Sequence, residues 1–219
     1  AGLAKAAVAF SVNGEQRDLS DVVSQDADIS IFTLDSDEGL EIMRHTVAAQ
    51  VLARAIKNLY PKAKLAIGPT IENGFYYDVD FGLMSFSEND LNKVEKQFLD
   101  FAREKSEFKM RMSTKADALD FYKKENNPFK IELIENLEDG TISFCDHADF
   151  TDLCRGGHIP HTGFIKAVKL LSVAGAYWRG DKKNQQLTRI YGISFPKQKL
   201  LKEYLHNIEQ AKLRDHRKI

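Results

Sequence analysis

One long amphipathic pattern constrains the fold of this 219-residue chain more than any other feature. Apolar side chains recur every three or four residues from Leu40 to Leu59, and Pro61 follows. This spacing lines up one apolar face on a helix, and Ser36 with the acidic residues after it gives a helix start signal. We therefore expect a long helix over about 38–59 that packs against the protein core.

Strand-like segments surround that helix without a regular strand–helix–strand alternation. Several are short alternating runs with an Asn-Gly or Asp-Gly turn beside them, which is typical of antiparallel hairpins. The sequence thus predicts an α+β fold with a long helix over an antiparallel sheet. The expected strands are 7–11, 28–34, 64–68, 74–80, 108–112, 129–134, 141–145, 165–171 and 185–193, and the other expected helices are 88–105, 114–124 and one from 196 onward.

Composition favours a cytoplasmic globular protein. No apolar run reaches the roughly 20 residues that a membrane-spanning helix needs, and the first residues lack the pattern of an export signal. Cys145 and Cys154 are the chain's two cysteines. A disulfide between them is possible, but free thiols are the expectation for a cytosolic protein.

Charge is distributed unevenly along the chain. Residues 1–154 carry 17 Lys and Arg against 28 Asp and Glu, whereas residues 155–219 carry 14 against 4. A final third with a net charge of +10 would attract a phosphate backbone. A solvated basic face with a basic tail accounts for the same numbers, so charge alone leaves both interpretations open.

The segment Asp152-Leu153-Cys154-Arg155-Gly156-Gly157-His158 is the strongest indication of a functional site. It holds a carboxylate, a thiol and an imidazole, and its two glycines allow a sharp turn. Cys154 and His158 could bind zinc with His45 as a third ligand. Alternatively, Cys154 could be a nucleophile beside a base, or the polar groups could bind a substrate and orient a water. A buried structural thiol with a loop histidine is the simplest alternative.

The order of several motifs resembles the N-terminal region of bacterial threonyl-tRNA synthetases. The matching segments are His45 on its helix, 66–69, 72–78, 152–158, Gly175-Ala176-Tyr177-Trp178-Arg179-Gly180-Asp181 within 174–181, 189–192 and the closing 214–218. The resemblance implies a partial β-grasp (TGS-like) module over 1–37, a tRNA editing domain over 38–195, and a helical linker over 196–219 toward an absent catalytic domain.

By the same resemblance, the chain would hydrolyse serine that is wrongly attached to threonine tRNA. His45 and Lys130 would position or activate the attacking water, with Cys154 and His158 in the same catalytic set. Tyr77 and Asp152 would bind the substrate. The implied partner is the 3′ end of threonine tRNA carrying serine, with no membrane, metal or other cofactor in this fragment; the full-length enzyme would be a homodimer through its catalytic domain.

The chain departs from the family at the second histidine of the His-x-x-x-His motif. Counting forward from His45 places Ala49 there, whereas counting back from 55–57 places Gln50 there. We expect a one-residue π-bulge near 46–51 that brings the Gln50 amide into the pocket as a substrate-binding group. With one imidazole missing, a non-catalytic tRNA-binding appendage and a zinc-stabilised structural module remain alternatives.

Overall fold

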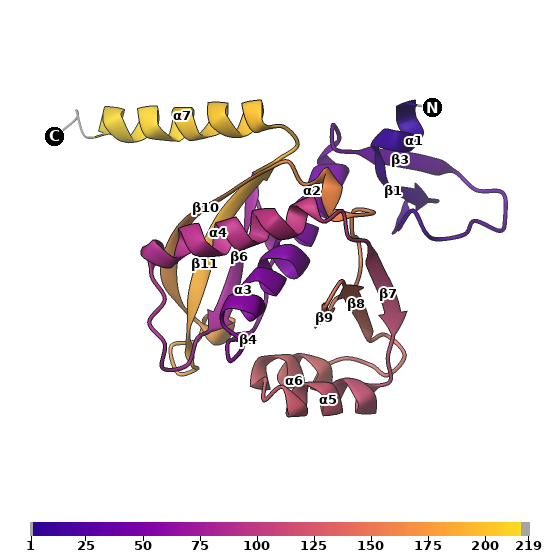
Figure 1. Cartoon of the computed structure of the whole chain (residues 1–219). Helices are drawn as coiled ribbons and strands as arrows, with labels where there is room; N and C mark the ends of the chain where they lie inside the picture. Colours follow the sequence, from indigo (N-terminus) through magenta and orange to yellow (C-terminus); the bar gives the residue numbers. More distant parts are fainter. Residues whose placement is uncertain (1, 216–219) are drawn as a thin grey trace.

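The computed structural model describes residues 2–215 and has the expected α+β fold (Figure 1). Its largest sheet is antiparallel, with the strand order β10-β11-β6-β4 and with β5 paired to β6. The strands are β4 (Lys64–Leu65), β5 (Thr70–Ile71), β6 (Gly74–Asp80), β10 (Ala167–Tyr177) and β11 (Gln186–Phe195).

The predicted long helix crosses one face of this sheet as three consecutive segments, α2 (Asp37–Thr46), the π-helical turn η1 (Val47–Leu52) and α3 (Ala53–Leu59). The Ser36 hydroxyl caps α2 by accepting a hydrogen bond from the Gly39 amide. α4 (Glu88–Arg103) lies alongside α3 in front of the sheet (Figure 1). The apolar faces of these helices and the sheet form the main core, which includes Val47, Val51, Phe75, Val79, Phe98 and Ile190.

A second antiparallel sheet, β7-β8-β9, lies on the other side of the long helix from α4 and carries the helical hairpin α5–α6. Its strands are β7 (Phe108–Met112), β8 (Ser143–His147) and β9 (Phe150–Leu153), and its helices are α5 (Lys115–Lys124) and α6 (Pro128–Glu135). The hairpin packs on the sheet through Ala118, Tyr122, Ile134, Ile142 and Phe144.

The strand predicted at 129–134 is wrong, because this segment is α6. The Asn127 side chain accepts a hydrogen bond from the Lys130 amide, and Pro128 occupies the first turn, where its missing N–H costs nothing. These two start signals prevail over the apolar residues of the segment, which resemble a strand only in composition.

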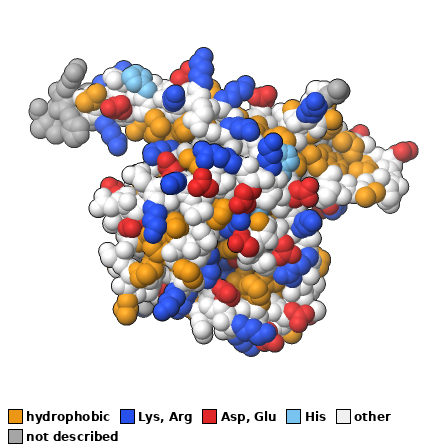
Figure 2. All heavy atoms as spheres, viewed as in Figure 1, with side chains coloured by type: hydrophobic (Ala, Val, Ile, Leu, Met, Phe, Trp, Pro, Cys, Tyr) orange, Lys and Arg blue, Asp and Glu red, His pale blue; other side chains and the backbone are white. Residues whose placement is uncertain are grey.

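The N-terminal module, residues 2–33, consists of α1 (Gly2–Ala6) and a three-stranded sheet in the order β2-β1-β3. The strands are β1 (Ala7–Val12), β2 (Glu15–Arg17) and β3 (Ile29–Thr33). Figure 2 shows hydrophobic side chains gathered on this module, where Val22, Ile29 and Ile31 are exposed. Its TGS-like assignment and the domain limits at 37 and 195 stay predictions.

The predicted C-terminal helix is α7 (Gln198–Asp215), which packs through Leu201 onto Ala167 and Ile193 of the large sheet. Residues 216–218 of the closing motif lie outside the described part of the chain. Lys and Arg side chains are spaced along α7 (Figure 2). Within residues 2–215, no helix combines the length and apolar character needed to cross a bilayer.

Candidate active site

A cavity of about 500 Å³ opens where α2, η1, β6, α6 and β9 come together. The fold brings five of the predicted site residues to its wall: His45, Tyr77, Lys130, Asp152 and Cys154. The remaining wall is mostly apolar, and it consists of Ala49, Ala66, Ile67, Gly68, Pro69, Leu133, Leu137, Thr141, Ser143, Leu153 and Arg155.

Asp152 is the centre of a buried polar cluster on one side of the cavity. Its carboxylate accepts hydrogen bonds from the Lys130 ammonium at 2.9 Å, the Tyr122 hydroxyl at 2.7 Å and the Tyr77 hydroxyl at 3.3 Å. Burial raises the pKa values of both tyrosines well above the usual range, and the Asp152 charge adds to this effect. Both phenols therefore stay protonated and donate to Asp152. Tyr122 carried no sequence signal, because only the tertiary fold brings α5 to β9.

Lys130 is 4% exposed and points into the cavity from α6. The segment 175–181, one of the matching motifs of the sequence, holds this helix in place. Trp178 packs on Phe129, and its indole N–H donates to Glu132 at 2.8 Å. Arg179 forms an ion pair with the same Glu132 at 2.5 Å. The segment thus acts on the site through α6, since neither Trp178 nor Arg179 lines the cavity.

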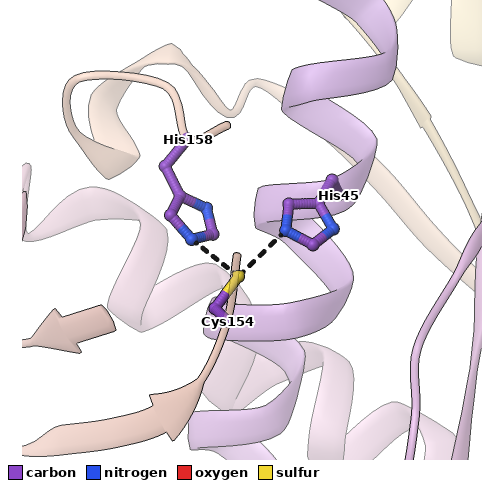
Figure 3. Close-up of side chains that lie close together, drawn as sticks. All are labelled: His45, Cys154 and His158. Atoms are coloured by element: carbon purple, nitrogen blue, oxygen red, sulfur yellow. Dashed lines mark hydrogen bonds between the residues drawn. The ribbon is translucent and has the colours of Figure 1, made fainter. Parts of the chain in front are cut away.

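Cys154, His45 and His158 form the other side of the site, and their side chains point toward one another (Figure 3). The Cys154 Sγ atom lies 3.1 Å from His45 Nε2 and 3.2 Å from His158 Nε2. His45 extends from α2, Cys154 directly follows β9, and His158 lies in the loop beyond the two glycines. The imidazole rings are stacked, with their centroids 5.1 Å apart.

Thr46 fixes the proton arrangement of this group. Its hydroxyl donates to the Ile42 carbonyl at 2.8 Å, so its oxygen must accept from His158 Nδ1 at 3.2 Å. His158 then carries its proton on Nδ1, and its Nε2 accepts from the Cys154 thiol. The sulfur in turn accepts from His45 Nε2–H, which leaves the lone pair of His45 on Nδ1. The sequence analysis missed Thr46, although its position beside His45 on the helix was visible.

Burial keeps all three groups uncharged. It lowers the pKa of His158 to about 3, with a smaller contribution from nearby His45, and it lowers the pKa of His45. It also raises the pKa of the Cys154 thiol to about 11. A thiol with that pKa is a poor nucleophile near neutral pH, so the geometry favours an acid–base or positioning role for this group. Cys145 is a separate, buried free thiol.

The same three side chains offer one sulfur and two nitrogen atoms that lie within 4.8 Å of one another. This donor set fits a zinc ion with an open coordination position. Metal binding at this group would require the Cys154 thiol to lose its proton. Metal analysis of the purified protein distinguishes a zinc site from the hydrogen-bonded arrangement.

The predicted π-helical turn is confirmed, but the predicted position of Gln50 is wrong. Gln50 is fully buried and does not line the cavity, whereas Ala49 does. The amide of Gln50 has no hydrogen-bond partner among the described protein atoms. The fourth residue after His45 thus lies on the cavity side, and the fifth enters the core. Of the two positions considered for the second imidazole, Ala49 is therefore the one on the cavity wall.

A known domain family matches the strands that frame this site. Residues 142–191 match the threonyl and alanyl tRNA synthetase second additional domain. The match covers β8, β9, the Cys154–His158 loop and most of the β10–β11 hairpin. The fold and site thus define a domain of the kind found in threonyl- and alanyl-tRNA synthetases.

Whole-chain comparison narrows the class further. The chain is 56% identical over 218 residues to the threonine–tRNA ligase of Flavobacterium johnsoniae and 53% identical to that of Flavobacterium psychrophilum, with 100% of the chain covered in each case. It is 52% identical over 213 residues to the enzyme of Porphyromonas gingivalis. The chain spans about a third of the length of these relatives. These matches confirm the resemblance to the N-terminal region of bacterial threonyl-tRNA synthetases over the length of this chain.

Proposed function

We propose that this chain hydrolyses the ester bond of serine wrongly attached to threonine tRNA. The observation that carries the proposal is the cavity itself, which has the buried Lys130 ammonium on one side and the neutral imidazole of His45 on the other. Both features are useful for ester hydrolysis. His158 does not line the cavity and contacts it through Cys154. The relatives of this chain are threonine–tRNA ligases, whose product is an aminoacyl ester of tRNA.

Each side of the cavity has a role in this reaction. His45 Nδ1 carries a free lone pair and can accept a proton from a water that attacks the ester carbonyl carbon. The carbonyl oxygen then gains negative charge, which the Lys130 ammonium stabilises. The bond from the carbonyl carbon to the ribose oxygen breaks, and that oxygen takes the proton that His45 accepted from the water. The products are free serine and tRNA with an intact 3′ end.

Selectivity has a simple physical basis. Serine lacks only the methyl group of threonine, a difference worth about 1–3 kcal/mol in one binding step. A second site that rejects the larger side chain removes the errors that remain after the first. Gly68 marks one tight part of the wall, because a Cβ atom there would lie 2.2 Å from the Tyr77 ring. The close approach of Gly68 and Tyr77 leaves a narrow apolar wall that can crowd a methyl group.

A deacylation assay on matched substrates tests the proposal. The 219-residue chain is expected to hydrolyse seryl-tRNA(Thr) at least tenfold faster than threonyl-tRNA(Thr), within the range that one methyl group allows. Equal rates on both esters would contradict the proposed selectivity for serine. Rates no higher than those in buffer would contradict the proposed hydrolysis. In the second case the binding of tRNA without hydrolysis would support the non-catalytic appendage, for which the Ala49 position is the favouring observation.

A further inference from the structure

The N-terminal module reaches into the candidate active site through Asp18. A carboxylate oxygen of Asp18 accepts a hydrogen bond from the His158 backbone amide at 3.3 Å, across 140 residues of sequence. The side chain of Gln16, two residues before Asp18, also lies close to the loop. A Cβ atom added at Gly157 would be 2.6 Å from the Gln16 side-chain nitrogen Nε2. The module and the Cys154–His158 loop are therefore in direct contact.

This loop depends on contacts from outside itself. Gly156 and Gly157 have φ angles of 98° and 79°, a conformation that glycine adopts without strain but that gives the backbone little rigidity. Ser143 holds one end of the loop through the backbone of Cys154. Thr46 holds the His158 ring at the other end. Thr46 also accepts from the Ile159 backbone amide at 3.2 Å, and Asp18 accepts from the backbone amide of His158 itself.

The environment of Asp18 fits this role. Its carboxylate is partly buried, which raises its pKa, and the backbone amides of His158 and Gly157 partly offset that cost. An adjoining groove of about 390 Å³ is lined by both parts of the protein, including Asp18, Arg17, Arg155 and Gly157. Water can enter this groove, so the module holds the loop at specific points and does not enclose it.

We infer that Asp18 is a positioning residue for the hydrolytic site, acting from the N-terminal module through the backbone of His158. The inference rests on the proposed hydrolysis. Loss of the carboxylate lets the two-glycine turn relax and moves the His158 ring away from Cys154 and Thr46. Displacements of this kind reduce turnover more than substrate binding.

Two variants of the full chain test the inference. Asp18→Ala removes the acceptor and should lower kcat for seryl-tRNA(Thr) about tenfold, with KM changed less than about twofold. Asp18→Asn keeps an acceptor oxygen and should retain at least about half of kcat. Asp26→Ala, an exposed aspartate in the same module, is the matched control and should leave kcat unchanged.

Amide hydrogen exchange supplies a readout that does not require activity. Exchange at residues 154–158 should accelerate in Asp18→Ala but not in Asp18→Asn or Asp26→Ala. The inference is overturned if Asp18→Ala stays within about twofold of the parent in kcat, or if both Asp18 variants lose activity and thermal stability equally. If the parent protein is inactive, the proposed hydrolysis fails, and unchanged exchange in Asp18→Ala then separately refutes the positioning role.

Discussion

The buried polar groups on the two sides of the cavity differ in charge. Around Asp152, two full charges are kept in the interior, and Lys130, Tyr77 and Tyr122 all donate to one carboxylate. Around Cys154, burial suppresses charge, and a chain of neutral groups is ordered by the Thr46 hydroxyl. The first side provides a fixed electrostatic field, and the second can exchange protons. We expect damage to the first to appear mainly as lost stability and damage to the second mainly as lost activity.

Asp152→Asn should have the largest effect. The variant keeps the shape of the side chain but leaves the Lys130 ammonium buried without a counter-charge, which typically costs about 3–5 kcal/mol. Urea unfolding of the parent and the variant measures the loss. The double variant Lys130→Met/Asp152→Asn should regain part of it, because no unpaired charge remains. If the double variant is as unstable as the sum of the two single changes, the ion pair is not the source of the effect.

His158→Ala tests the opposite side and should affect activity before stability. Removing this neutral ring takes away the hydrogen-bond acceptor of the Cys154 thiol. The thiol is then free to reorient, and the proton arrangement between Cys154 and His45 is lost. We expect kcat for seryl-tRNA(Thr) to fall about 100-fold, the scale associated with misplaced catalytic groups. A loss below about threefold would show that His158 is a structural loop residue. Circular dichroism at matched temperature verifies that the variant is folded.

The sequence predicted the parts of the site that local patterns encode. The long helix with its π-turn followed from apolar spacing and from the family motif around His45, and the 152–158 segment located the loop. Asn127 and Pro128 encode the helical state of 128–135 locally, although the apolar composition of the segment resembles that of a strand. By contrast, Tyr122 and Asp18 reach the site only through packing between distant segments. No pattern near either residue distinguishes it from an ordinary core tyrosine or loop aspartate.

Gln50 shows why the local geometry of a helix has to be seen. The predicted π-bulge is present, but it does not turn the fifth residue toward the cavity. The side of the helix that each residue faces depends on where the wide turn begins. It begins at Val47, and Ala49 still faces the cavity while the Gln50 amide enters the core, as regular α-helical spacing from His45 would also place them. One residue of offset decides which position could carry a second imidazole.

Cys154→Ser should have the smallest effect, and it separates a positioning thiol from a nucleophilic one. With its pKa raised to about 11, the Cys154 thiol is protonated near neutral pH and acts as a donor to His158 and an acceptor for His45. A serine hydroxyl can make both hydrogen bonds. Hydrolysis of seryl-tRNA(Thr) should therefore stay within about threefold of the parent rate, since no covalent bond to sulfur is needed.

Cys145→Ser, at the other buried thiol, controls for the general cost of replacing sulfur in the interior. Complete loss of activity in Cys154→Ser alone, together with a burst of product in the parent, would instead identify the thiol as the nucleophile.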